Sequence, residues 1–371
     1  MRTLVVSDLH LGARTQVDLL RAAEPRARLM AALADIDRLV LLGDIIELRH
    51  GPVREIFGAA EPFFSDLREA LPSRAEVVLL AGNHDHELVA PWLARRAFDS
   101  RPAPSLGLEN QVEPEAAEPL ARLVRWLEPH RVRVAYPGVW LRPDVYATHG
   151  HYLDRHVTVP SFERVAVGVT SRVARTGPGR RETPDRYEAA LAPIYALIHA
   201  MAQGAPPQQG AGPHTASSRI WKALAGGSRR PAMRRRALRA GFGLMIAGLN
   251  RAGVGPLRAN VSPPELRRAG LRAMGEAATA MGIEADHVIF GHTHRAGPWP
   301  KDDAGEWATP GRAQLMNTGS WVYERHFLTS TPEESPYWPG VGVVVDDEGP
   351  PQLRRFLCGL GHAEVWPGGL R

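Results

Sequence analysis

Short apolar runs recur along the chain, and each of them ends at a glycine or a polar side chain. In the first part of the chain these runs are Thr3 to Ser7, Arg38 to Leu42 and Glu76 to Ala81. Continuous apolar runs of this length are typical of strands covered on both faces in a parallel sheet. Amphipathic stretches rich in alanine and leucine separate them, at Leu19 to Ala34 and Phe57 to Leu71, and predict helices. The alternation predicts β-α-β units and an α/β fold.

From Val132 the pattern changes to shorter β-rich pieces, which predict a second sheet. A helical region interrupts them, with helices expected near Phe162 to Ala174, Tyr187 to Gln203, Arg219 to Leu224, Met233 to Ala252 and Pro264 to Met281. The β pattern then returns, with strands expected at His287 to Phe290, Gln314 to Thr318, Val341 to Val345 and Gln352 to Leu357. We therefore divide the chain into a core in two parts, residues 1–151 and 286–371, and a large helical insertion, residues 152–285.

Composition excludes several classes of protein. No apolar run reaches the roughly eighteen residues that a membrane span requires, so no transmembrane span is expected. The N-terminus has no long apolar region of the kind found in signal peptides, which predicts a cytoplasmic protein. Cys358 is the only cysteine, so an intrachain disulfide is impossible and thiolate chemistry is disfavoured.

Positive charge is concentrated in the insertion. Residues 152–285 contain 20 Lys and Arg residues against 8 Asp and Glu residues, whereas the whole chain carries a formal net charge of +5. Arg234, Arg235, Arg236 and Arg239 precede an apolar stretch, Ala240 to Leu249. Three interpretations stay open for this region: a packed helical lid, a peripheral contact with anionic lipid through residues 230–252, and nucleic-acid binding.

Polar residues with metal-binding side chains follow the predicted strands in sequence. The motifs are Asp8-x-His10, Gly43-Asp44-x-x-Glu47, Gly82-Asn83-His84-Asp85, His149-Gly150-His151 and Gly291-His292-Thr293-His294. Ligands in open α/β sheets bind beyond the carboxyl ends of the strands, where all of these residues are expected. Asp8 and His10 are two residues apart on extended backbone, so both point the same way and one metal can take both.

These motifs, in this order, resemble those of the calcineurin-like metallophosphoesterase superfamily. The resemblance implies a four-layered α/β/β/α sandwich and two metal sites. It implies Asp8, His10 and His294 at the first metal, Asn83, His149 and His292 at the second, and Asp44 as the bridge. It further implies that His84 acts on the substrate and that Glu47 orients His84. We place Asp85 with the catalytic residues, and His151 and Arg295 on the substrate.

The chemistry agrees with this resemblance. Two cations about 3.5–4 Å apart clamp a phosphoryl displacement and lower the pKa of a bridging water, which makes hydroxide available near neutral pH. Histidine nitrogens with oxygen ligands and no sulfur favour transition metals over magnesium or calcium. We expect two divalent ions, manganese first, with iron, zinc or nickel as alternatives.

The expected function is hydrolysis of a phosphodiester or pyrophosphate bond, on a nucleotide- or lipid-linked substrate. The protein-phosphatase branch follows the bridging aspartate with Asp-Arg-Gly, where this chain has Glu47-Leu48-Arg49, so a phosphoprotein substrate is disfavoured. The pattern looks more like the UDP-diacylglucosamine pyrophosphatases, although those carry arginine where this chain has His84. A nuclease acting on DNA or RNA, and a metal-binding scaffold without catalysis, are the alternatives.

Overall fold

The computed structural model describes residues 1–99, 103–158, 170, 182–203, 247–248, 250–251, 263–328, 331 and 334–366. Two of the helices expected from the sequence, near Phe162 to Ala174 and Met233 to Ala252, fall almost entirely outside these residues. The helix expected near Arg219 to Leu224 lies outside them altogether.

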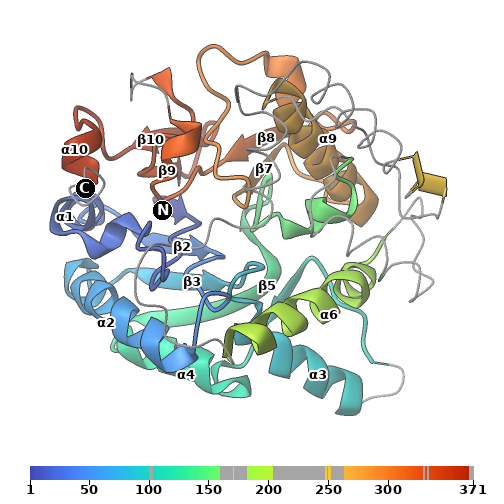
Figure 1. Ribbon diagram of the computed structural model, residues 1–371, viewed down its shortest axis with the longest axis horizontal. Coiled ribbons are helices and arrows are strands. Elements are labelled where there is room, and N and C mark those ends of the chain that lie inside the picture. The colour runs from blue at the N-terminus through green and yellow to red at the C-terminus, as the bar shows by residue number, and fades with distance from the viewer. Residues whose placement is uncertain are drawn as a thin grey trace, which may run out of the picture.

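The described strands form one continuous path in the order β10-β9-β1-β2-β3-β5-β6-β7-β8, with β4 paired to β5 (Figure 1). Their bounds are β1 Thr3–Val6, β2 Arg38–Leu42, β3 Glu76–Leu80, β4 Glu109–Gln111, β5 Arg131–Arg142, β6 Val145–Thr148, β7 His287–Phe290, β8 Gln314–Asn317, β9 Val341–Val345 and β10 Gln352–Arg355. The first half of β5 runs parallel to β3, and its second half runs antiparallel to β6. The expected second sheet is therefore present, and the long strand β5 joins it to the first.

The described helices are α1 Ala23–Ala31, α2 Val53–Ala70, α3 Ala90–Asp99, α4 Glu118–Trp126, α6 Pro184–Gln203, α9 Pro263–Met281 and α10 His362–Val365. The single helix expected over Leu19 to Ala34 is wrong, because the structure divides it into a short 3-10 turn, η1 (Leu19–Arg21), and α1. Ala22 between them is extended, and Pro25 lies in the first turn of α1. Proline has no N–H to donate to the preceding turn, so a helix containing Pro25 has to begin just before it.

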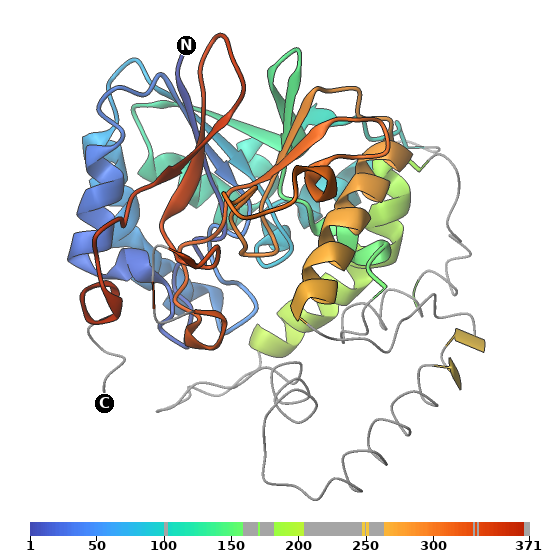
Figure 2. The same ribbon diagram turned by 90° about the horizontal axis from the view of Figure 1, so that it is seen from above.

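Alternating residues of the central strands pack into two different cores. Leu4, Leu39 and Val77 face a cluster that includes side chains of α1, α2 and α4. Their neighbours face the opposite side, where residues of β1, β2 and β3 meet residues of β5, β6, β7 and β9 in a core to which none of the described helices contributes. On the far side of the second half, Val288 and Phe290 pack against α9. The layers follow the order helix, sheet, sheet, helix, which confirms the predicted sandwich (Figure 2).

Helix α6, in the predicted insertion, packs on the core through aromatic residues. Tyr187, Leu191 and Tyr195 of α6 form a cluster with Tyr152 from the 3-10 turn η4 (His151–Arg155). Tyr152 and Tyr187 stack with ring centroids 4.6 Å apart. One end of the insertion is thus fixed directly behind the motif that contains His149 and His151.

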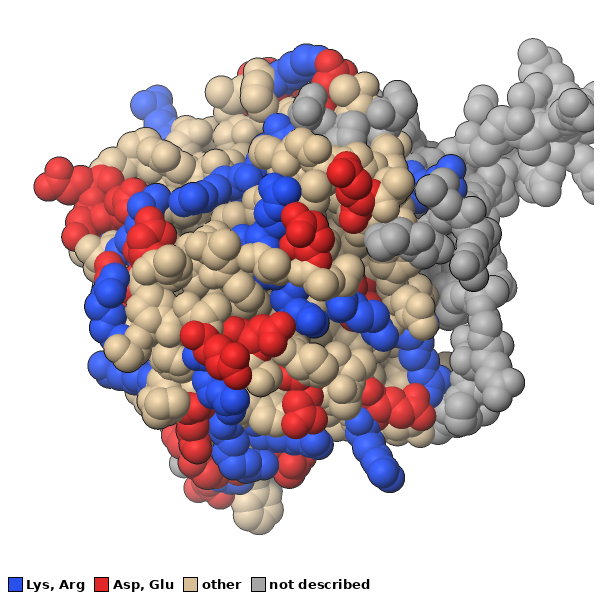
Figure 3. Space-filling model, turned by 90° about the vertical axis from the view of Figure 1, so that its left-hand side faces the viewer, with Lys and Arg blue, Asp and Glu red and all other residues tan. Residues whose placement is uncertain are grey.

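Charge is mixed on the face of the molecule seen in Figure 3, where basic and acidic side chains are interspersed.

Within the described residues, no helix is both long and apolar enough to cross a bilayer.

Candidate metal centre

The residues predicted as metal ligands meet at the carboxyl ends of the parallel strands. Strands β1, β2 and β3 run parallel in register, so the loops that follow them lie at one edge. Strands β6 and β7 are also parallel. The loops bring together Asp8 and His10 after β1, Asp44 after β2, Asn83 after β3, His149 after β6, and His292 and His294 after β7.

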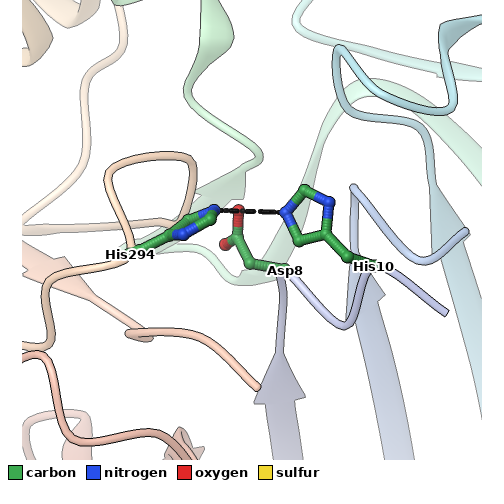
Figure 4. A group of neighbouring side chains, drawn as sticks. All are labelled: Asp8, His10 and His294. Atoms are coloured by element: carbon green, nitrogen blue, oxygen red, sulfur yellow. Dashed lines mark hydrogen bonds and ion pairs between the residues drawn. The ribbon is translucent and has the colours of Figure 1, made fainter. Parts of the chain in front are cut away.

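Asp8, His10 and His294 form the first group, with ligand atoms that all lie within 4.8 Å of one another. The two histidines lie on either side of the Asp8 carboxylate (Figure 4). Asp8 Oδ1 is 3.3 Å from His294 Nε2, and the Nε2 atoms of His10 and His294 are 3.1 Å apart. One small cation between these atoms would contact all three side chains.

Asp44, His149 and His292 form the second group under the same distance limit. Asn83 joins it, because its Oδ1 lies 2.9 Å from His292 Nδ1 and 3.1 Å from His149 Nε2. Asp44 Oδ2 is 3.3 Å from His149 Nε2 and 3.7 Å from His10 Nε2. The Asp44 carboxylate therefore lies between the two groups.

Five of these seven residues have a left-handed backbone conformation, with φ values between 46° and 66°, which non-glycine residues rarely adopt. They are Asp8, His10, Asp44, His292 and His294. Such conformations cost about 1–3 kcal/mol each and are found mainly at functional sites. Two neighbouring glycines allow the close approach, because a Cβ on Gly82 would collide with the Asp44 carboxylate and one on Gly291 with that of Asp8.

Each of the four histidines in the two groups donates a hydrogen bond from its outer ring nitrogen. The bonds are His10 Nδ1 to Glu47 Oε2 (2.9 Å), His149 Nδ1 to the Leu42 carbonyl (2.9 Å), His292 Nε2 to Asp154 Oδ1 (3.0 Å) and His294 Nδ1 to Glu324 Oε2 (3.2 Å). An outer donor fixes the tautomer, so the inner nitrogen carries a lone pair toward the centre of the site.

The ring nitrogens and oxygens that face the centre of the site form a ligand set suited to a cation. Lone pairs on His149 Nε2 and His292 Nδ1 both face the Asn83 carbonyl oxygen, which leaves three acceptors close together unless a positive charge lies between them. Burial lowers the pKa of His149, but the neighbouring Asp44 carboxylate outweighs it and raises the pKa to about 9. The site thus favours a positive charge next to the Asp44 carboxylate. Histidine nitrogens with carboxylate and amide oxygens are ligands that divalent transition metals accept.

Glu47 connects the centre to His84. The buried Glu47 carboxylate accepts from Nδ1 of His84 at 2.8 Å and also from Nδ1 of His10. Burial lowers the pKa of His84 to about 4, even though the Glu47 carboxylate acts in the opposite direction. His84 is therefore neutral at pH 7. It also forms a third close group with His10 and Asp44.

Asp85, which we predict among the catalytic residues, lies beneath the site. It is fully buried, and its carboxylate accepts from backbone N–H groups of Gly82 (2.7 Å), Ile45 (2.7 Å), Asp44 (3.2 Å) and Ile46 (3.4 Å). These bonds tie the loop that carries Asp44 to the loop that carries Asn83. These contacts give Asp85 a positioning role, and its place among the catalytic residues stays a prediction.

The two predicted substrate ligands, Arg295 and His151, contact other side chains of the protein. Arg295 makes two bonds to Asp302, at 2.9 and 2.6 Å, and stacks over Trp307. His151 is buried, with its Nε2 3.3 Å from the Tyr136 hydroxyl. These contacts place both residues in the packing around the site, and their role as substrate ligands stays a prediction.

Several residues of the site were not predicted from the sequence. Asp154 and Glu324 hold the outer nitrogens of His292 and His294, and nothing in the motifs indicates either of them. A pocket beside the centre is lined by Arg49, Asn83, His84, His86, Glu87, Tyr195 and His199. Tyr195 and His199 belong to α6, so the insertion forms part of the wall.

The four-layered fold and these clusters of histidine and aspartate define a metallophosphoesterase. The sequence model of the calcineurin-like phosphoesterase family matches residues 1–169, which include five of the seven predicted ligands. The fold brings the other two, His292 and His294, to the same place. This family match indicates a calcineurin-like phosphoesterase domain, and such a domain is a metal-dependent phosphoric ester hydrolase. No curated protein matches the chain.

Proposed function

We propose that this chain hydrolyses a phosphodiester or pyrophosphate bond at a dinuclear metal centre. The ligands in this proposal are Asp8, His10 and His294 for one ion, Asn83, His149 and His292 for the other, and Asp44 for both. One observation carries the proposal: the Asp44 carboxylate lies between two compact ligand groups, within 3.7 Å of a histidine of each. Both histidines face Oδ2, and a carboxylate oxygen has two lone pairs, so it could contact two cations at once.

Two ions bound in this way would polarise the phosphoryl group and lower the pKa of a water molecule. The protein side chains would bind the substrate and transfer protons to or from it. Asn83 contributes a neutral oxygen, which limits the negative charge close to an anionic substrate. The Nε2 atom of His84 is not held by Glu47, so a protonated His84 would donate from it to the phosphoryl or leaving oxygen. Glu47 would stabilise the imidazolium whenever His84 takes up a proton.

Manganese is the metal that we propose first, with iron, zinc and nickel as alternatives. The proposal depends on the ligand set of histidine nitrogens and oxygens without sulfur, which disfavours magnesium and calcium as sole occupants. Metal content of the protein purified from cells grown with equal supplies of these metals would decide the identity.

The substrate that we propose is nucleotide- or lipid-linked, and the insertion, residues 152–285, would select it. This is supported by the pocket wall, because α6 places Tyr195 and His199 next to Asn83 and His84. His84 stands where the UDP-diacylglucosamine pyrophosphatases carry arginine, so we do not extend the proposal to their specific substrate.

Asp44→Asn tests the dinuclear centre. The substituted side chain loses its charge and bridges two cations poorly, so both metals should be lost or weakened and hydrolysis of bis(p-nitrophenyl) phosphate should fall to background. Metal content and turnover are measured on the same preparation. Asp66→Asn is the matched control, because Asp66 pairs with Arg26 on the exposed face of α2. Full activity of Asp44→Asn, or of chelated wild-type protein, would contradict the proposal.

A further inference from the structure

The pocket beside the metal centre contains hydrogen-bond donors that nothing in the described structure satisfies. Nε and Nη2 of Arg49 are shielded from solvent and have no hydrogen-bond partner. The hydroxyl of Tyr195, from α6, is in the same state. A shielded donor without an acceptor costs about 1–3 kcal/mol, and more when the group is charged. Unpaired donors in a pocket therefore indicate a ligand that supplies acceptors.

The two side chains lie against each other. The Arg49 guanidinium stacks over the Tyr195 ring, with Cζ 4.9 Å from the ring centroid. This contact holds the plane of the guanidinium. Nε and Nη2 share one edge of that plane, so their N–H bonds point in parallel. A pair of parallel donors matches two oxygens of one phosphate or carboxylate group.

One ring nitrogen of each pocket histidine is already engaged. His86 contacts Glu188 at 2.9 Å, His199 Nδ1 lies 3.3 Å from the Leu48 carbonyl, and His84 Nδ1 is held by Glu47. Glu87 is the acidic residue of the lining. Arg49 and Tyr195 are thus the donors left for a ligand, beside two residues of the metal centre.

We propose that Arg49 and Tyr195 form a phosphate-binding subsite, which takes phosphoryl oxygens of the substrate that the metal ions do not hold. The subsite deepens the proposed function and rests on it for the source of the phosphate. Arg49 comes from the loop after β2, and Tyr195 comes from the insertion. The insertion therefore completes a substrate site on the core.

Titration of inorganic phosphate into the manganese-loaded protein tests the subsite by calorimetry, without any turnover. Arg49→Gln should weaken phosphate binding by about tenfold or more, because it removes a charged pair of donors. Tyr195→Phe removes only the hydroxyl and should weaken binding by about threefold or more. Arg122→Gln is the control, since Arg122 stacks on Phe57 and Trp126 of the α2 and α4 layer. It should bind phosphate like the wild type.

Metal content and melting temperature are measured for every variant, so that a loss of metal is not mistaken for a loss of the subsite. If Arg49→Gln does not fold, Arg49→Lys replaces it. Its phosphate affinity should be lower than that of the wild type. Wild-type phosphate affinity in Arg49→Gln and Tyr195→Phe, at full metal content, would overturn the proposal. Phosphate binding that depends on Arg49 in a protein that hydrolyses no ester would instead overturn the proposed function and keep the subsite.

Two substrates identify the phosphate that occupies the subsite. On bis(p-nitrophenyl) phosphate, which has one phosphate, a raised KM in Arg49→Gln assigns the subsite to the reacting group. A raised KM only on a dinucleoside pyrophosphate assigns it to the second phosphate. A KM unchanged on both substrates would count against the subsite.

Discussion

At the scale of single residues, the motifs predicted most of the site because their chemistry depends on short spacings. Asp8-x-His10 and His292-x-His294 place two ligands on one loop, and the structure brings both pairs into the centre. Asp154 and Glu324 could not be predicted in this way. Each approaches its histidine from a distant part of the chain, at sequence separations of 138 and 30 residues. Only the folded backbone sets those contacts.

Glu47 illustrates what the structure adds to a motif. The sequence assigns it to His84, but its carboxylate also accepts from His10. It therefore serves a proposed ligand and a proposed catalytic residue at once. Removing its charge should affect both functions, whereas removing His84 should affect only one.

His84→Ala should lower kcat by about 10²- to 10⁴-fold while metal content stays near that of the wild type, because it removes a proton-transfer group.

Glu47→Gln should lower kcat and also weaken metal binding, because His10 loses the acceptor that fixes its tautomer. Steady-state kinetics and metal analysis of the same samples test both. Glu55→Gln, which alters an exposed partner of Arg14, is the control. Stoichiometric metal loss in His84→Ala would show that His84 is itself a ligand.

At the scale of elements, the alternation of β1, β2 and β3 was predictable because each strand is covered on both faces. Helix boundaries were less predictable, as the break at Ala22 shows, since a proline can either interrupt a helix or begin one. The role of η4 also depended on the fold. This short turn follows His149 directly and carries Asp154 to His292, so the segment that begins the insertion also supports the second metal group.

Asp154→Asn and Glu324→Gln should each weaken one metal site. Asp154 holds His292 and Glu324 holds His294, and the two histidines belong to different ligand groups. Loss of such a supporting carboxylate typically reduces metal affinity by about 10- to 100-fold. Each variant should therefore bind one manganese ion as tightly as the wild type and the other more weakly.

Calorimetric titration of the metal-free protein, with electron paramagnetic resonance to detect coupled manganese pairs, measures this. The double variant should lose affinity at both sites. Asp66→Asn, which removes an exposed carboxylate paired with Arg26 on α2, should not show the pattern. An equal loss at both sites in each single variant would mean that the carboxylates support the loop as a whole and not one histidine each.

At the scale of the whole molecule, helix α6 of the insertion is held firmly against the core. Glu188 of α6 accepts from the hydroxyls of Tyr136 and Tyr152, both at 2.5 Å, and contacts His86 at 2.9 Å. His86 follows the loop of Asn83 and His84. The same contacts that dock α6 therefore position Tyr195 beside the metal centre.

The arginine cluster of the insertion is predicted to bind an anionic surface. Its members lie outside the described residues, so this prediction rests on the sequence; they are Arg234, Arg235, Arg236 and Arg239. Four cationic side chains within six residues attract a polyanionic surface, and each contributes about 1 kcal/mol near an anionic membrane. The attraction is screened by salt. A small substrate that fits inside the pocket has no need of them.

Changing these four arginines to glutamine should leave kcat on bis(p-nitrophenyl) phosphate nearly unchanged. Binding to vesicles containing phosphatidylglycerol should weaken by about tenfold or more and lose most of its salt dependence, because four charges are removed. The control variant changes Arg28, Arg68, Arg74 and Arg125, which are exposed on the core, and lowers the net charge equally. Loss of affinity for single-stranded DNA in place of vesicles would identify a nucleic-acid partner. A fall in kcat on the small substrate would show that the insertion supports the catalytic centre itself, and its role as a selector of substrates would then be wrong.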